Sequence, residues 1–333
     1  MNEADSERIR QAFIGKQHQE TKDISRADLV IINSCIVRKS AENRVYGLIN
    51  NLSKINPKTK IILTGCLAGW ALLDKSEKNL KVLQRRIGEK IKIALIQDLA
   101  DFKIEPIPTS KRQALVPISN GCNHFCAYCI VPFARGREIS RTEKEILTEI
   151  KCLVKKGYFE IMLLGQNVNS YGKDLKNTNF PQLLSKVAKI KELKKVEFMS
   201  SNPWDFSDDL IWVIAQNKNI SRTLHLPLQS GDDSILKKMN RPYTAKKYFS
   251  LIKKIKKAIP EVILTTDIIV GFPGETKTQF KNTVSLVKKV NFKKVYIGKY
   301  SPRPGTMAAK LKDNVSPPEK KRRWQVLEKL INK

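Results

Sequence analysis

The sequence lacks any apolar run near the roughly 20 residues that a bilayer-spanning helix needs. Its first ten residues, MNEADSERIR, carry acidic groups where a secretory signal peptide would carry an apolar stretch. A hydrophobic content of 41% with a mean hydropathy of -0.35 is ordinary for a soluble protein, and 333 residues can form two or three domains. We therefore expect a cytoplasmic protein without membrane contact.

Acidic residues are also scarce, since 32 Asp and Glu stand against 62 Lys and Arg and give a net charge of +30. Such an excess favours a polyanionic partner, because each neutralised phosphate releases condensed counterions. Lysine accounts for 46 of the basic residues and arginine for only 16, whereas recognition of phosphates and bases enriches arginine. A general drift of composition toward lysine therefore remains an alternative to nucleic-acid binding.

Cysteine is rare as well, with six residues in the chain. In a reducing cytosol, cysteines in a chain of this size are expected to be ligands rather than members of a disulfide framework. Cys122, Cys126 and Cys129 are clustered, while Cys35 and Cys66 stand apart. Cys152 lies alone in a predicted helix and is interpreted as an incidental small apolar residue.

The first hundred residues predict an α/β domain. Apolar strands are expected at 28–33 and 60–64, each followed closely by a cysteine, with a helix at 41–55 between them. This order favours a Rossmann-like parallel sheet that brings Cys35 and Cys66 to the same carboxyl edge. The domain is expected to span 1–103, because residues 104–113 lose the periodicity and read as a linker.

A repeating strand-then-helix rhythm follows the linker. The six expected strands are residues 114–118, 160–164, 195–200, 223–228, 262–270 and 292–300. They predict an open, partial (β/α)6 barrel over 114–316, with its chemistry at the carboxyl ends of the strands, and a terminal helix at 317–333. A Ser140 to Glu143 capping box is expected to open a helix at 142–156, and Thr276 to Gln279 a later one.

Cys122, Cys126 and Cys129 form a C-x3-C-x2-C loop directly after the first barrel strand. Three thiolates can hold three irons of a 4Fe-4S cubane and leave the fourth iron open to a small bidentate ligand. Structural zinc is the alternative, but it needs a fourth protein ligand, and the nearby candidate His124 lies inside the same tight loop.

This loop and its surroundings, from Ile118 to Arg141, closely resemble the core of the radical S-adenosylmethionine (SAM) methylthiotransferases. The resemblance continues in LGQNVN at 164–169, HLPLQSG at 225–231, DIIVGFPGE at 267–275 and YSPRPGT at 300–306. The GQNVN version resembles the MiaB type, which modifies isopentenylated adenosine beside the tRNA anticodon. The same chemistry on threonylcarbamoyl-adenosine in tRNA, or on an aspartate of a ribosomal protein, is the alternative.

The resemblance implies a radical enzyme. The adenine C2–H bond is unactivated, and no side chain here could deprotonate it at neutral pH, so a cofactor must perform the hard step. In the family a 4Fe-4S cluster on the three clustered cysteines passes an electron to SAM and produces a deoxyadenosyl radical. A second 4Fe-4S cluster and a second SAM then supply sulfur and methyl. An electron donor such as flavodoxin or ferredoxin, tRNA as substrate and a monomeric enzyme are expected.

The resemblance also implies roles for individual residues. Cys35 and Cys66 match two of the three ligands of the second cluster, although buried cysteines that merely follow strands are the plainer interpretation. SAM contact is expected for Tyr128, Gly165, Gln166, Asn167, Ser201, Gln229, Ser230, Gly271 and Glu275, and contact with tRNA for Arg135, Arg137, Arg141 and Asn169. Plain packing, turn formation, satisfied buried amides and a solvated basic face are the respective alternatives.

The chain departs from the family pattern at both ends. The third ligand of the second cluster would lie two residues before the position of Met1, on a first strand that this sequence lacks. The small β-rich TRAM domain that usually follows the terminal helix is also missing. We therefore expect a chain truncated at both ends, and a non-catalytic remnant that binds an iron-sulfur cluster and RNA is the alternative from another functional class.

Overall fold

The computed structural model describes residues 1–332 and divides the chain into two compact units. The first unit comprises residues 1–111, 120–123 and 130–138, and the second comprises 112–119, 124–129 and the chain from 139 onward. The predicted linker at 104–113 lies beside the first of these divisions. The expectation of one continuous 114–316 core differs from this division, because two segments around the cysteine loop pack with the first unit.

The first unit is built on a three-stranded parallel sheet. Its strands are β1 (Leu29–Ser34), β2 (Lys60–Gly65) and β3 (Lys92–Ile93), in that spatial order. The predicted strands at 28–33 and 60–64 are thus confirmed with ends shifted by one residue. The parallel order arises because helix α2 (Lys39–Ile55) returns the chain between β1 and β2 and buries Val45, Ile49 and Leu52 against the sheet.

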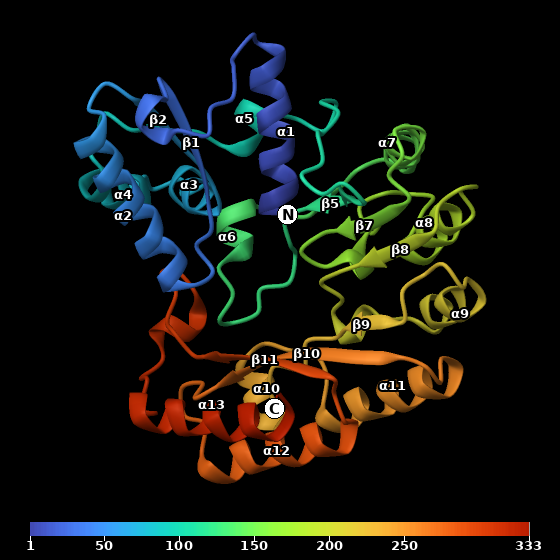
Figure 1. Ribbon diagram of the computed structural model, residues 1–333. Coiled ribbons are helices and arrows are strands. Elements are labelled where there is room, and N and C mark those ends of the chain that lie inside the picture. Colours follow the sequence, from blue (N-terminus) through green and yellow to red (C-terminus); the bar gives the residue numbers. More distant parts are fainter. Residues whose placement is uncertain (333) are drawn as a thin grey trace. The chain divides into compact units, whose positions relative to one another are not determined.

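Several further helices complete the first unit (Figure 1). The sequence did not predict α1 (Asn2–Gly15), which buries the charged residues Asp5, Glu7 and Arg8 beside Ile9 and therefore has no clean apolar face. The remaining elements are the 3-10 turn η1 (Ile24–Arg26), α3 (Cys66–Leu72), α4 (Lys78–Ile87), α5 (Ile96–Leu99) and α6 (Val131–Arg135).

The second unit is an open, partial α/β barrel. Its parallel strands form two three-stranded sheets, β4–β7–β8 and β9–β10–β11, and a parallel bridge between Val196 and Ile220 continues the first sheet toward the second. All six predicted strands are confirmed. They are β4 (Gln113–Pro117), β7 (Glu160–Leu164), β8 (Lys195–Phe198), β9 (Thr223–His225), β10 (Ile263–Val270) and β11 (Lys294–Lys299).

Helices follow most of these strands, and α12 and α13 lie along one side of β10 and β11 (Figure 1). The core is apolar because inward residues of the strands meet helix residues such as Ile146, Ile150 and Leu153. The helices are α7 (Glu143–Lys155), α8 (Phe180–Ala188), α9 (Asp208–Gln216), α10 (Asp233–Lys238), α11 (Ala245–Ala258), α12 (Lys277–Val290) and α13 (Pro317–Ile331). Shorter elements are β5 (Ser119–Asn120), β6 (Ile139–Ser140), η2 (Val168–Ser170), η3 (Pro203–Asp205) and η4 (Met307–Lys310).

The helix caps confirm one prediction and correct another. Thr276 caps α12 through a capping box with Gln279, as expected. The cap of α7 is Thr142 with Glu145 and not Ser140 with Glu143. Ser140 belongs to β6, where its hydroxyl accepts a hydrogen bond from the Gly172 N–H and its own N–H donates to Asp174. Ser140 therefore lies in a strand, outside the helix that begins three residues later at Glu143.

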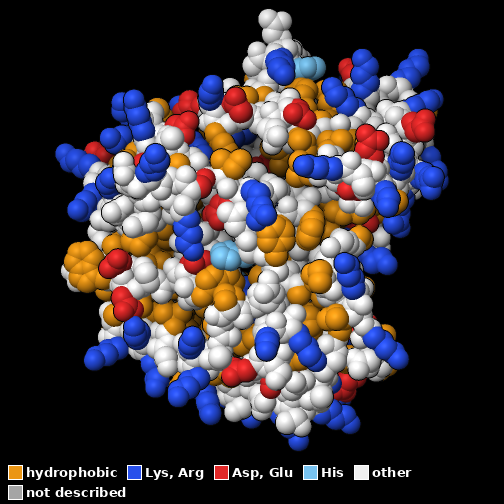
Figure 2. Space-filling model, turned by 180° about the vertical axis from the view of Figure 1, so that it is seen from behind, with side chains coloured by type: hydrophobic (Ala, Val, Ile, Leu, Met, Phe, Trp, Pro, Cys, Tyr) orange, Lys and Arg blue, Asp and Glu red, His pale blue; other side chains and the backbone are white. Residues whose placement is uncertain are grey.

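Lysine and arginine side chains are spread over the face drawn in Figure 2, and acidic side chains are sparser there. This distribution agrees with the excess of 62 basic over 32 acidic residues in the sequence. Within residues 1–332, no helix has the length and apolar character required to cross a membrane.

Candidate functional site

Two cysteines of the first unit occupy equivalent places on neighbouring strands. Ser34 at the end of β1 is in register with Gly65 at the end of β2, so Cys35 and Cys66 follow directly at the same sheet edge, as predicted. Gly65 has φ 85°, and an added Cβ would lie 2.4 Å from the Ser34 oxygen. Only glycine permits this sharp turn, which places Cys66 as the first residue of α3.

Arg135 of α6 lies buried beside Cys66 in the same unit. Its Nε donates to the Cys66 Sγ at 3.3 Å, its Nη2 pairs with Asp5 at 2.7 Å, and its Nη1 donates to Asn120 at 2.9 Å. Burial raises the pKa of the Cys66 thiol, and the adjacent guanidinium opposes that rise. The assignment of Arg135 to tRNA phosphates stays a prediction, and these buried contacts do not support it.

The first cysteine of the C-x3-C-x2-C loop is described with the first unit. Cys122 is buried, and its N–H donates to the Gly136 carbonyl at 3.1 Å. Gly121 just before it has φ 85°, and a Cβ there would meet the Arg137 carbonyl at 2.0 Å. The backbone before the cysteine therefore approaches the 136–137 segment too closely for any residue except glycine.

The other two cysteines of the loop are described with the second unit. Cys126 is buried and Cys129 half-buried, and a turn joins them because the Cys129 N–H donates to the Cys126 carbonyl at 2.9 Å. Both backbone polar groups of Ala127 form hydrogen bonds. Its N–H donates to the Met239 carbonyl, and its carbonyl accepts from the Ala308 N–H. All six cysteines are free thiols, and Cys152 is exposed on α7.

Within residues 1–332, no three His, Cys, Asp or Glu side chains gather closely enough to form a ready metal site. The fit of an iron-sulfur cluster therefore rests on the chemistry of the donors. Cys122, Cys126 and Cys129 are three free thiols within eight residues, and thiolates are the ligands that iron-sulfur clusters prefer. They fit a 4Fe-4S cluster in which the fourth iron has no protein ligand.

Arg241, which the sequence did not single out, lies against Cys126. Its Nη1 donates to the Cys126 Sγ at 3.5 Å and to the Asn202 Oδ1 at 3.2 Å, and its Nη2 donates to the Pro227 carbonyl at 2.9 Å. The guanidinium lies over the rings of Trp204 and Tyr243, 4.4 and 5.3 Å from their centroids. The residue is only 6% exposed.

Asp205 joins the cysteine loop to the strand ends of the second unit. Its carboxylate accepts hydrogen bonds from Asn167 Nδ2 at 2.6 Å and Lys173 Nζ at 2.5 Å, and it lies 3.2 Å from His124 Nε2. Burial would raise the pKa of this carboxyl, but the hydrogen bonds from His124, Lys173 and Asn167 leave it below its ordinary value. Asp205 is therefore ionised at neutral pH.

Buried polar atoms without a partner cluster at the carboxyl ends of the barrel strands. Within residues 1–332, no hydrogen bond reaches the Ser201 Oγ, the Gln229 Oε1 or the Asn169 Oδ1. Gln229 also has φ 65°, a left-handed conformation that favours glycine. Buried polar groups almost always have partners, so these three atoms fit a site that a polar ligand such as SAM would complete.

Other side chains predicted to contact SAM form hydrogen bonds or close contacts within the protein. Asn167 donates to Asp205 and accepts from the Asn202 N–H, and the Ser230 hydroxyl lies 3.4 Å from Thr283. Gly165 lies close to Ser119, whose Oγ an added Cβ would meet at 2.9 Å. Gln166 is half-buried. These residues shape the strand ends, and direct contact with SAM remains a prediction for them.

The loop from Gly271 to Glu275 is held by a buried ion pair. Glu275 accepts from the Gly271 N–H at 2.7 Å and pairs with Arg323 of α13 at 2.6 Å, and both side chains are almost fully buried. Burial raises the pKa of the Glu275 carboxyl, while the hydrogen bonds from Gly271 and Arg323 oppose the rise. The carboxylate thus fixes the loop, and contact with SAM remains a prediction for Gly271 and Glu275.

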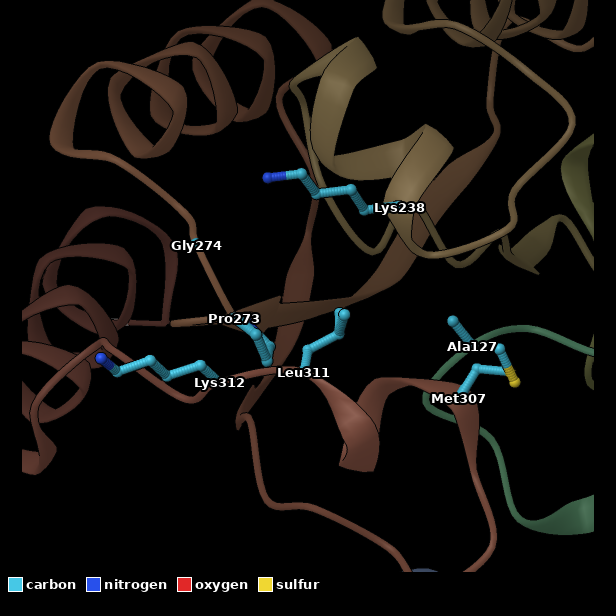
Figure 3. Close-up of a pocket in the computed structure, with 7 residues that line it drawn as sticks. All are labelled: Ala127, Lys238, Pro273, Gly274, Met307, Leu311 and Lys312. Carbon is cyan, nitrogen blue, oxygen red and sulfur yellow. The ribbon is translucent and has the colours of Figure 1, made fainter.

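A pocket of about 410 Å³ opens between this loop and the cysteine loop of the second unit (Figure 3). Figure 3 shows Ala127 beside Met307 and Pro273 beside Leu311, with the Lys312 side chain extending away from them. Tyr128, next to Ala127, packs in an apolar group with Phe272 and Tyr300, and burial raises the pKa of its phenol well above the ordinary value. This environment fits both plain packing and an apolar wall for a ligand.

The remaining predicted tRNA contacts lie in different environments. Arg141 is buried, pairs with Glu149 at 2.7 Å and donates to the Pro117 carbonyl at 2.8 Å, so its guanidinium is engaged within the second unit. Arg137 is exposed in the first unit. Asn169 donates to the Asn202 carbonyl at 3.3 Å while its Oδ1 lacks a partner among the described residues.

Comparison with known proteins agrees with the cysteine loop and the partial barrel described above. The model of the radical SAM superfamily matches residues 116–287, and that of the uncharacterized protein family UPF0004 matches residues 1–83. The tRNA-2-methylthio-N(6)-dimethylallyladenosine synthase of Clostridium botulinum strain Langeland is 44% identical, over 100% of this chain and 79% of its own length. The enzyme of the same name from Thermotoga petrophila is 41% identical, over 100% of this chain and 80% of its own length.

The chain belongs to this family of radical SAM methylthiotransferases, of the MiaB type. Solved structures support the fold of a radical SAM enzyme. The radical SAM methyltransferase TsrM from Kitasatospora setae, solved with tryptophan and a SAM analogue, has a TM-score of 0.58 at 14% identity, over 90% of this chain and 66% of that chain. The cobalamin-dependent radical SAM enzyme OxsB has a TM-score of 0.56 at 10% identity, over 98% of this chain and 53% of that chain.

Proposed function

We propose that this methylthiotransferase family member modifies tRNA by placing a methylthio group on C2 of N6-isopentenyladenosine next to the anticodon. The observation that carries the proposal is the similarity to enzymes of that name over all of this chain and 79% of the relative's length, together with the free thiols of Cys122, Cys126 and Cys129. We further propose that it acts in the cytoplasm, as a monomer, with a low-potential electron donor such as flavodoxin or ferredoxin.

Separate residues of the chain would bind the cluster, bind SAM and position the loop beside them. Cys122, Cys126 and Cys129 would hold a 4Fe-4S cluster, and the unpartnered Ser201 and Gln229 atoms would hydrogen-bond polar groups of SAM. When bound, the cluster and SAM supply the radical chemistry that an unactivated aromatic C–H bond needs. Glu275 would keep the 271–275 loop in place through Arg323.

A second 4Fe-4S cluster on Cys35 and Cys66 is part of the proposal. Both thiols are free and follow β1 and β2 at one sheet edge.

Anaerobic reconstitution with iron and sulfide should give about four irons at the Cys122 to Cys129 loop even after Cys35→Ala and Cys66→Ala are combined. A single retained zinc without broad visible absorption would instead identify the loop as a structural zinc site.

Nucleoside analysis of tRNA tests the substrate. Cells that lack the gene should lose 2-methylthio-N6-isopentenyladenosine and accumulate the precursor without sulfur, as measured by mass spectrometry. A plasmid copy should restore the modified nucleoside, and a Cys126→Ala copy should not, whereas a Cys152→Ala copy should restore it because Cys152 is exposed on α7. Unchanged levels in the deletion strain would remove this substrate and direct attention to threonylcarbamoyl-adenosine.

A further inference from the structure

Arg241 is a buried cation that has no anionic partner among residues 1–332. Its contacts are the oxygen atoms of Asn202, Pro227 and Tyr243, two aromatic rings and the Cys126 sulfur. Within residues 1–332, no carboxylate lies within ion-pair distance of its guanidinium. Leaving a buried charge uncompensated costs several kcal/mol, so such a residue is rarely retained without a counter-charge.

Among the described hydrogen-bond partners of Arg241, Cys126 is the one that becomes formally negative when it binds iron. The Nη1 to Sγ distance of 3.5 Å is within the range of an N–H···S hydrogen bond. Both partners are buried, so water screens their attraction little. The two rings and the Pro227 carbonyl hold the guanidinium in one place, which favours a preorganised charge over a mobile surface residue.

We propose that Arg241 is a positioning residue that provides the built-in counter-charge for the cluster on the Cys126 loop and raises its reduction potential. This inference rests on the proposed cluster. Reduction adds one electron from a low-potential donor and makes the cluster more negative by one charge. A fixed cation donating to a ligand sulfur stabilises that reduced state more than the oxidised state, because hydrogen bonds and charge at the sulfurs set the potential.

A potentiometric titration followed by electron paramagnetic resonance tests the proposal. All proteins carry Cys35→Ala and Cys66→Ala, so that only the Cys122 to Cys129 cluster contributes to the signal, and iron content is measured first. Arg241→Gln should make reduction at least about tenfold less favourable, a fall of about 59 mV for a one-electron couple. Arg241→Lys, which retains the charge but loses the planar fork, should lie between that variant and the parent.

Arg222→Gln is the matched control. Arg222 also donates to backbone carbonyls of the second unit, including those of Asn217 and Ile220, and it pairs with Glu261 without touching a cysteine. It should leave the potential unchanged. About four irons in Arg241→Gln with the parental potential would overturn the proposal. Absence of iron from the parent itself would refute the proposed cluster, a separate failure that iron analysis identifies before any titration.

Asn202→Asp provides a second route if Arg241→Gln does not fold. The substitution is nearly isosteric and places a carboxylate where the Asn202 Oδ1 accepts from Arg241 at 3.2 Å. Pairing with that carboxylate would neutralise the guanidinium, so the potential should fall. A potential unchanged in folded, iron-loaded Asn202→Asp would contradict the role of Arg241.

Discussion

Asp205 illustrates how one carboxylate can organise residues that are distant in the sequence. It binds Asn167 and Lys173, lies beside His124 of the cysteine loop, and its side chain is only 7% exposed. Because three donors converge on it, its loss would free all three together. The residue was not predicted, since a single aspartate among 32 acidic residues carries no motif.

Asp205→Asn should lower the free energy of unfolding by about 1.5–3 kcal/mol at pH 7, the value of hydrogen bonds to a charged group. The folded-state pKa lies below the ordinary value, so the stabilisation is present above the unfolded pKa near 4 and is lost as pH falls through the folded pKa. Urea unfolding at pH 7 and near pH 3 should show the difference from the parent shrinking.

Asp208→Asn is the control for this experiment, because its carboxylate is 75% exposed and pairs with Lys254 at the surface. Exposed pairs of this kind contribute about 0–1 kcal/mol. An Asp205→Asn protein that matched Asp208→Asn at pH 7 would show that the buried network contributes little to stability.

At the scale of the elements, the close approach of α3 and α6 in the first unit depends on Gly69. A Cβ added at Gly69 would lie 2.0 Å from the Ala134 carbonyl oxygen, which is backbone and cannot rotate away. The contact holds α6, and with it Arg135, against the helix that begins with Cys66. The two helices can be this close only because one of them presents hydrogen instead of a side chain.

Gly69→Ala should therefore reduce the free energy of unfolding by about 1–3 kcal/mol through overpacking. Gly47→Ala in α2 is the matched control, because an added Cβ there meets nothing within 4 Å. It should raise stability by about 0.5–1 kcal/mol, the helix preference of alanine over glycine. Chemical denaturation of the pair measures both, and equal stability of the two variants would contradict the close approach.

Strands were easier to predict than helices or contacts. Short apolar runs predicted β1, β2 and the six barrel strands to within a few residues of their ends. The parallel pairing of β1 with β2 also predicted that Cys35 and Cys66 lie at one sheet edge. Helix α1 was missed because its buried face carries Asp5, Glu7 and Arg8, and the α7 cap was misplaced because two serine and threonine candidates lie two residues apart. The contacts of Arg241 with Cys126 and of Asp205 with Asn167 and Lys173 were missed because these partners lie more than 30 residues away along the chain.

At the scale of the whole molecule, the charge of +30 gives a testable signature of the proposed substrate. If at least two phosphates are neutralised on binding, affinity for tRNA should fall about tenfold or more between 50 and 200 mM salt. Fluorescence anisotropy with labelled tRNA would measure the slope. Affinity independent of salt would indicate that the basic surface reflects composition alone.

The backbone of Ala127 is hydrogen-bonded to Met239 on one side and to Ala308 on the other, and these bonds between protein groups anchor the stretch between Cys126 and Cys129. Because these bonds use polypeptide groups alone, they would position two of the three proposed ligands independently of a cluster. Iron and sulfide arriving there would meet a rigid cradle, so assembly of the cofactor need not be accompanied by folding of this stretch, and its amide protons should resist exchange even in the metal-free protein.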